Sequence, residues 1–123
     1  MDISYVAGFF DGEGCIILAK PCGSSRGYSL RVSITQKHKE TLVEIQKMFN
    51  GKIYPHSRKK GEGYWSWEAV RKEVAYNFLK TILPYLQLKR KQAQVGLMFL
   101  EFNHNWHREE RELCWKVLKI LKE

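Results

Sequence analysis

Two acidic residues, Asp11 and Glu13, stand close together in a glycine-rich stretch near the start of the sequence. Both fall at the C-terminal end of a predicted helix, where the helix dipole disfavours negative charge, so their placement costs stability and indicates a function. Oxygen ligands at such a helix end suit Mg²⁺, which keeps several waters and takes its remaining ligands from phosphate. Metal ions gathered at a phosphodiester can generate the attacking hydroxide and stabilise the leaving oxygen. The pair therefore predicts either metal-assisted phosphodiester cleavage or, in the plainer interpretation, ordinary helix-end acids before a turn.

Small residues in the same stretch favour close contact with a second helix. Ala7, Gly8 and Gly12 leave one helix face nearly without side chains, so another such helix can approach to backbone contact. Two acidic groups at the base of the paired helices would then lie close together, which is tolerable when divalent cations sit between or beside them. The residues predicted to form this helix–helix interface are Val6, Ala7, Gly8, Phe10 and Asp11.

A regular succession of helices and strands positions these residues. Ser4 is expected to cap a helix over residues 5–12, whose apolar residues share one face. Strict alternation predicts a strand over 28–36, and helical spacing predicts a helix over 39–49 that ends at the following Asn-Gly pair. The remaining predicted elements are strands over 15–20, 51–57 and 64–70, and helices over 74–83, 91–102 and 108–122.

This order of elements, αββαββ followed by helices, predicts an α+β domain. Helices are expected to pack on one face of a four-stranded antiparallel sheet, with additional helices at the C-terminal end. A length of 123 residues fits a single domain with one core. Within it, residues 1–14 are assigned to the interface helix and the acidic site, 15–70 to the sheet with its intervening helix, and 74–123 to supporting helices.

The predicted sheet has one apolar face and one polar face. Leu30, Val32 and Ile34 point to the side that helices must cover, while the alternate residues point outward. An antiparallel ribbon with hydrogen-bonding side chains at every second position can enter a major groove and read base edges. The alternative is a merely solvated face, which antiparallel sheets usually have. The residues predicted to contact DNA are Ser29, Arg31, Ser33, Thr35, Tyr54, His56, Arg58, Lys59, Ser66 and Glu68.

The charge balance favours a polyanionic partner. Lys and Arg number 21 against 13 Asp and Glu, which gives a net charge of +8 and a pI near 9.5; ribosomal, membrane-surface and heparin-binding proteins share such a surplus. No apolar run approaches the length of a membrane span, and the N-terminus lacks the features of a signal peptide. Three scattered cysteines, Cys15, Cys22 and Cys114, indicate reduced thiols. We expect a soluble intracellular protein, in a bacterial or archaeal cytoplasm or an organelle matrix, that binds neither a membrane nor a small-molecule substrate.

Several stretches of the sequence, in the right order, resemble one protein family. Residues 6–14 read VAGFFDGEG, residues 15–20 read CIILAK, residues 34–37 read ITQK and residues 83–93 read LPYLQLKRKQA. The first stretch resembles the LAGLIDADG signature of the homing endonucleases, and the second lies where that family places its first DNA-reading strand. The other two stretches fit the same family, so the resemblance extends over most of the chain.

This resemblance implies roles for individual residues. Glu13 occupies the position of the family's metal-binding acid, Gly12 supplies a backbone carbonyl to the metal, and Asp11 has a structural role at the helix end. Glutamate in place of the commoner aspartate at position 13 is a departure whose longer arm shifts the metal geometry. Gln36 would orient the attacking water, and Lys89 would place a positive charge near the scissile phosphate or its hydrated metal.

Plainer interpretations exist for two of these residues. Gln36 could simply end a strand, and Lys89 could contact only backbone phosphates together with its basic neighbours. Many relatives carry a further basic residue a few positions after the glutamine; here Lys39 is the best candidate for it.

The function that the resemblance implies is that of an intron-encoded homing endonuclease. One copy of the signature requires a homodimer, because cleavage of both strands of double-stranded DNA needs two acids, and a two-fold dimer reads a near-palindromic site. Mg²⁺ is the expected cofactor, with Mn²⁺ substituting and Ca²⁺ supporting binding without cleavage. Two alternatives remain: a catalytically silent relative that acts as an RNA-splicing maturase or DNA-binding regulator, and a basic structural module of a ribonucleoprotein. Intact Glu13, Gln36 and Lys89 speak against the silent relative.

Overall fold

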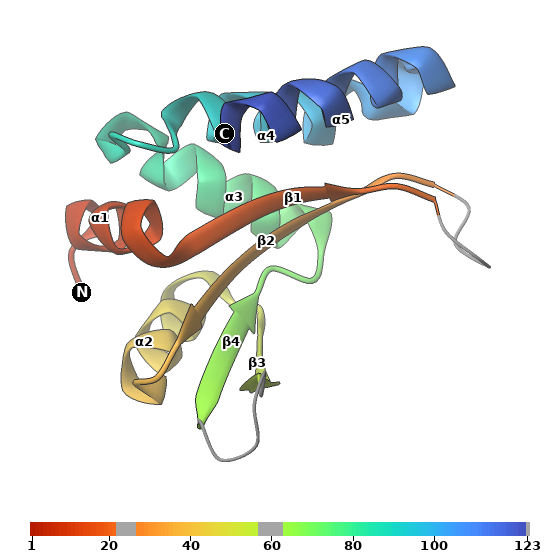
Figure 1. Cartoon of the computed structure of the whole chain (residues 1–123). Coiled ribbons are helices and arrows are strands. Elements are labelled where there is room, and N and C mark those ends of the chain that lie inside the picture. The colour runs from red at the N-terminus through yellow and green to blue at the C-terminus, as the bar shows by residue number, and fades with distance from the viewer. Residues whose placement is uncertain (22–26, 57–62, 123) are drawn as a thin grey trace.

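A four-stranded antiparallel sheet with helices on one side forms the centre of the computed structural model, which describes residues 1–21, 27–56 and 63–122 (Figure 1). The strands follow the order β1-β2-β4-β3 across the sheet. They are β1 (Gly14–Ala19), β2 (Ser29–Gln36), β3 (Lys52–His56) and β4 (Tyr64–Glu68). The helices are α1 (Ile3–Glu13), α2 (Lys39–Phe49), α3 (Lys72–Ile82), α4 (Arg90–Phe102) and α5 (Arg108–Lys122), with short 3-10 turns η1 (Leu83–Tyr85) and η2 (Asn103–Asn105). The predicted fold class is confirmed.

The start of α1 differs from the sequence prediction. The N-cap is Asp2, whose side chain accepts hydrogen bonds from the backbone N–H of Ser4 at 3.3 Å and from the Ser4 hydroxyl at 3.0 Å. Asp and Ser are equally good caps, and here the earlier one prevails because the helix begins two residues sooner, at Ile3. Ser4 therefore lies inside the first turn of the helix.

Strand register confirms which residues share each face of the sheet. Ile16 pairs with Val32 and Ile34 pairs with Trp67, and all four side chains are fully buried on the helix side. Arg31 pairs with Ile17 on the opposite face, which none of the described helices covers (Figure 1). The two faces alternate along each strand as the two-residue period of an extended chain requires.

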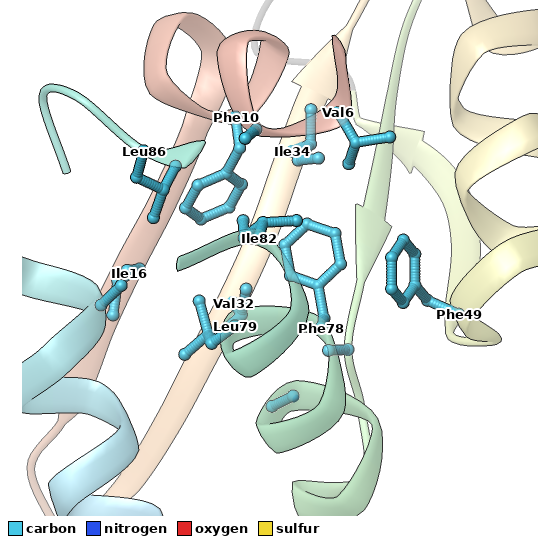
Figure 2. Close-up of a cluster of buried hydrophobic side chains, with 14 of the residues drawn as sticks. Val6, Phe10, Ile16, Val32, Ile34, Phe49, Phe78, Leu79, Ile82 and Leu86 are labelled. Atoms are coloured by element: carbon cyan, nitrogen blue, oxygen red, sulfur yellow. The ribbon is translucent and has the colours of Figure 1, made fainter. Parts of the chain in front are cut away.

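Aromatic contacts join the helices to the sheet in the core (Figure 2). The ring of Phe78, from α3, meets Phe10 of α1 edge-on at 5.4 Å between centroids and Phe49 of α2 at 4.9 Å. It also packs on Trp67 of β4 at 4.8 Å. One fully buried ring thus joins four elements from distant parts of the chain and packs α1 onto the core.

Two predicted loops fall largely outside the described residues. These are the turn at 58–63, with the predicted DNA contacts Arg58 and Lys59, and the hairpin loop at 21–27. Among the residues that are described, no helix has both the length and the apolar character to span a membrane.

Candidate active site and nucleic-acid interface

Asp11, near the end of α1, binds the backbone that leads into α4. Its side chain is only 7% exposed. One carboxylate oxygen accepts the N–H of Gln87 at 2.7 Å, and the other accepts the N–H groups of Leu88 and Lys89 at 3.1 and 2.9 Å. A negative charge is favourable here because Lys89 is the N-cap of α4, where the helix dipole is positive. Asp11 thereby fixes a segment more than seventy residues away in sequence against the C-terminal end of α1.

Lys89 is brought to the same helix end by this anchor. Its ammonium group donates a hydrogen bond of 2.6 Å to the backbone carbonyl of Asp11. The guanidinium of the next residue, Arg90, donates to the carbonyls of Leu86 and Pro84 at 3.2 and 3.1 Å and so fixes the turn from within. A positive charge therefore stands beside the residues that follow Asp11.

Those residues are Gly12 and Glu13, and both are exposed. Glu13 is the last residue of α1 and stands immediately before β1. Its carboxylate has no hydrogen-bond or ion-pair partner within residues 1–21, 27–56 and 63–122. The Gly12 carbonyl lies beyond the last intrahelical bond, which runs from the Gly14 N–H to the Phe10 carbonyl. The helix thus ends in oxygen atoms that are free to accept a ligand.

Gln36, at the end of β2, lies at this same end of the sheet. Ile34 pairs with Gly14, the residue after Glu13, and Gln36 follows two positions further along. The Gln36 side-chain oxygen accepts the Lys37 N–H at 2.7 Å, which fixes the orientation of the amide and leaves its NH₂ group as a donor. The ammonium of Lys39 stands 4.1 Å over the ring of Trp65, and Trp65 is the strand partner of Gln36.

The uncovered face of the sheet carries most of the residues predicted to contact DNA. Ser29 and Arg31 are exposed, Ser33, Thr35 and His56 are half-buried, and all but His56 lie on β2. The phenol of Tyr54 donates a hydrogen bond of 2.6 Å to the Glu68 carboxylate, and this bond raises the pKa of Tyr54 to about 12. One oxygen of Glu68 is therefore engaged in advance, which fixes the direction of the other.

Ser66 is the exception among the predicted contacts on this face. Its side chain is only 2% exposed, and its hydroxyl shares a hydrogen bond of 2.8 Å with that of Thr35. The alternation correctly placed Ser66 on the uncovered face, but close neighbours on both adjacent strands remove it from solvent. Ser66 therefore bonds to a neighbour on this face and offers no accessible group of its own.

Five further residues of this face are not among the predicted DNA contacts. By register, Cys15, Ile17 and Ala19 of β1 lie beside Ser33, Arg31 and Ser29, while Lys52 and Tyr64 lie across from Glu68 and His56. The side chain of Ile17 is 41% exposed on this face. The β1 strand is apolar on both faces, so only its pairing with β2 reveals which side chains face outward.

The interface predicted along α1 needs correction. Val6, Ala7 and Phe10 are fully buried against their own chain, and Asp11 is nearly so, which leaves them no surface for a second chain. Only Gly8 of the predicted set is exposed. Exposed residues on one face of α1 are Ser4, Tyr5, Gly8 and Gly12, bordered by Phe9, whose ring stacks on that of Tyr5 at 6.3 Å.

Comparison with known proteins agrees with this geometry. The sequence is 32% identical over 109 residues to the DNA endonuclease I-CvuI of Chlorella vulgaris, covering 82% of this chain and 65% of that protein. It is 29% identical over 91 residues to the probable intron-encoded endonuclease aI2 of Debaryomyces hansenii, covering 64% of this chain and 14% of that protein. A crystal structure of I-CvuI in complex with the I-CreI target superposes with a TM-score of 0.76 at 28% identity, over 97% of this chain and 80% of the other.

The chain thus spans less than two thirds of the length of either curated relative. The family model of the LAGLIDADG endonucleases, however, matches residues 6–117, which include the acidic helix end, the uncovered sheet face and the Lys89 anchor. On this match, and on the structural likeness to I-CvuI, the chain belongs to the LAGLIDADG endonuclease family.

Proposed function

We propose that the chain is a sequence-specific, divalent-metal-dependent endonuclease that makes double-strand breaks in DNA at a long, near-palindromic site. The observation that carries the proposal is the end of α1, where the partnerless carboxylate of Glu13 lies two residues from the Asp11 carbonyl that holds Lys89. An unsatisfied acid and a held cation beside an exposed, polar sheet face are what a phosphodiester substrate requires. The relative I-CvuI has been crystallised with its target DNA in the presence of calcium, which supports DNA as the substrate.

The donor set at the helix end fits a hard divalent cation. Glu13 and the Gly12 carbonyl offer only oxygen, which is the ligand type that Mg²⁺, Mn²⁺ and Ca²⁺ prefer. Nowhere in the described part of the chain do three His, Cys, Asp or Glu side chains gather into a metal site. The remaining ligands would therefore come from DNA phosphates, waters and a second copy of the chain. A bound cation would supply Lewis-acid stabilisation of the phosphate and a more acidic water.

Lys89 and Gln36 would serve this chemistry with groups that are already oriented. The Lys89 ammonium donates one of its three N–H groups to the Asp11 carbonyl, so two donors and the positive charge remain for phosphate oxygens. The Gln36 amide, with its oxygen engaged by the Lys37 N–H, would donate its NH₂ group to a phosphate or a water. Neither group needs to reorganise when charge develops on the phosphate, and such preorganisation is what lowers the barrier.

Two chains are needed because each supplies one acid. We propose that the exposed glycines Gly8 and Gly12 let α1 pack against α1 of a second chain, since in the described part of the chain nothing beyond their neighbours and the backbone of α1 itself lies within 4 Å of a Cβ built at either position. The two-fold axis would then place the two Glu13 residues near each other and both sheet faces along one DNA duplex.

The test is cleavage of a randomised duplex library, followed by sequencing of the cut ends. With wild-type protein and Mg²⁺ or Mn²⁺ we expect a near-palindromic consensus to be cut, and with Ca²⁺ the same sites to be bound but left intact. Glu13→Gln should bind these sites with unchanged preference and cut them at least about 1,000-fold more slowly, because the metal-binding charge is lost while size is kept.

Glu73→Gln, an exposed carboxylate in the first turn of α3, is the matched control and should cut like wild type. Cleavage retained in Glu13→Gln would refute the site. Selective binding by the wild type without any cutting in Mg²⁺ or Mn²⁺ would instead indicate a silent maturase or DNA-binding regulator, and binding without selectivity would indicate a basic structural module.

A further inference from the structure

The outer half of the β1–β2 ribbon extends beyond the rest of the sheet (Figure 1). Strand β2 pairs with β4 only at residues Ser33 to Gln36, whereas it pairs with β1 from Ser29 to Ile34. The stretch around Ser29 and Arg31 therefore has a single neighbouring strand. A two-stranded ribbon is marginally stable alone and twists readily, so this half depends on other elements to hold its direction.

Glu112 of α5 contacts the residues that flank both strands of this ribbon. One carboxylate oxygen of Glu112 forms an ion pair with the ammonium of Lys20, the residue that follows β1, at 2.8 Å between oxygen and nitrogen. The other accepts a hydrogen bond of 2.9 Å from the hydroxyl of Tyr28, the residue that precedes β2. Glu112 and Tyr28 are 84 positions apart in sequence. A single side chain of α5 thus joins the two strand ends at the outer end of the ribbon.

The surroundings of Glu112 keep the carboxylate charged and Lys20 in place. The ion pair with Lys20 and then the hydrogen bond from Tyr28 lower the pKa of Glu112. The Lys20 ammonium also stands 3.9 Å from the centroid of the Trp115 ring, one turn further along α5. Lys20 is therefore bound to α5 by two contacts, through its charge and through the face of an aromatic ring.

The outer end lies far from the acidic end of α1. Strand β1 has six residues between Glu13 and Lys20, which at about 3.3 Å per residue is about 20 Å, or about six base pairs of duplex DNA. The outward side chains of this half are Ser29 and Arg31 on β2, and Ala19 and Ile17 opposite them on β1. Glu112 lies on the helix side of the ribbon and acts on these side chains only through the strands.

We infer that Glu112 is a positioning residue for DNA recognition: by joining Lys20 and Tyr28 it sets the direction of the outer ribbon and so the base-pair preference about six pairs from the cleavage centre. The inference rests on the proposed function, because a preference at defined base pairs exists only if the uncovered face reads DNA. Its signature is local. Loss of the Glu112 contacts with Lys20 and Tyr28 would lower the discrimination between bases at the outer base pairs. Discrimination at the inner base pairs, near Thr35 and Gln36, would stay unchanged.

The experiment compares Glu112→Gln with Glu109→Gln, which removes the same charge from an exposed position one turn earlier on α5. The readout is the discrimination at each position of a partly randomised target, together with kcat and KM on the wild-type target in Mg²⁺. Glu112→Gln should lower discrimination at the outer base pairs about fivefold and raise KM by a similar factor, with kcat unchanged. Tyr28→Phe, which removes only the hydroxyl, should give a smaller change at the same positions, and Glu109→Gln should match wild type.

Hydrogen exchange of the protein without DNA is the second arm. Amides of residues 16–19 and 29–32 should exchange faster in Glu112→Gln than in Glu109→Gln, while those of β4 stay unchanged. Equal discrimination in Glu112→Gln and wild type, or an equal loss at inner and outer base pairs, would overturn the inference and leave the proposed function intact. A wild-type protein that selects no site at all would overturn both.

Discussion

The two faces of α1 differ in what covers them. The inward face carries Val6, Ala7 and Phe10, all fully buried, and Asp11, whose carboxylate is saturated by three backbone N–H groups. The outward face carries Gly8 and Gly12; within the described residues, nothing beyond their neighbours and the backbone of α1 lies within 4 Å of a Cβ built at either glycine. The inward face is thus buried by other parts of the same chain, and the outward face is exposed.

This difference separates the two acids that lie two residues apart. Asp11 faces inward and stabilises the fold. Its carboxylate accepts hydrogen bonds from the turn before α4, and its backbone carbonyl accepts one from the Lys89 ammonium. Glu13 is exposed at the C-terminal end of the helix and has no partner in the described part of the chain. An acid that is saturated should matter for stability, and one that is unsatisfied should matter for activity.

The largest effect on stability is expected from Asp11→Asn. The amide keeps the size but loses the charge and one acceptor, so at least one of the partly buried N–H groups of residues 87–89 loses its hydrogen bond. We expect the free energy of unfolding to fall by about 3 kcal/mol. Urea unfolding followed by circular dichroism measures it, with Glu13→Gln as the control; that control should be unchanged or slightly more stable, because an acid at a helix C-terminus is unfavourable. A loss in Asp11→Asn no greater than in the control would contradict the structural role.

A smaller loss is expected from Gly14→Ala, at the junction of α1 and β1. A Cβ at Gly14 would overlap the ring of Phe10, which is fully buried and packed against Phe78. Since the ring has no room to withdraw, we expect overpacking to cost about 2 kcal/mol. The same urea titration decides, and wild-type stability in Gly14→Ala would show that the inward face of α1 is less tightly packed than described.

How much of this contrast the sequence reveals depends on whether the signal is local. The bounds of α2 were predicted correctly because Leu42, Ile45 and Phe49 recur at helical spacing and Asn50 with Gly51 ends the helix at once. The faces of β2 were equally predictable from alternation. For α1, periodicity identified Val6, Ala7 and Phe10 as one stripe, but a stripe does not say whether its own chain or a second chain covers it.

Other features of the site were beyond the sequence because they join distant segments. The bond from Asp11 to Lys89 and the clamp from Glu112 to Tyr28 span 78 and 84 positions, and nothing in the local pattern at either end marks a partner. The burial of Ser66 depends likewise on how Thr35 and Tyr54 crowd it from adjacent strands. Lys89 was proposed from the family resemblance, because its position in the stretch 83–93 matches a position of the family's pattern.

Gly8→Ala should have the smallest effect on the single chain and tests the outward face. Alanine is a better helix former than glycine, and the added methyl group has no close contact with side chains or other elements in the described part of the chain, so the free energy of unfolding should rise by about 0.5–1 kcal/mol. The same methyl group would separate two α1 helices that pack through their glycines. The dimer should therefore dissociate at a higher protein concentration than the wild-type dimer does. Analytical ultracentrifugation over a concentration series measures this, with Asn77→Ala on the exposed face of α3 as the control that gains helix propensity without touching α1. If Gly8→Ala and Asn77→Ala dissociate alike, α1 is not the dimer contact; if only Gly8→Ala weakens the dimer while its chain becomes more stable, the two faces of α1 serve the fold and the assembly separately.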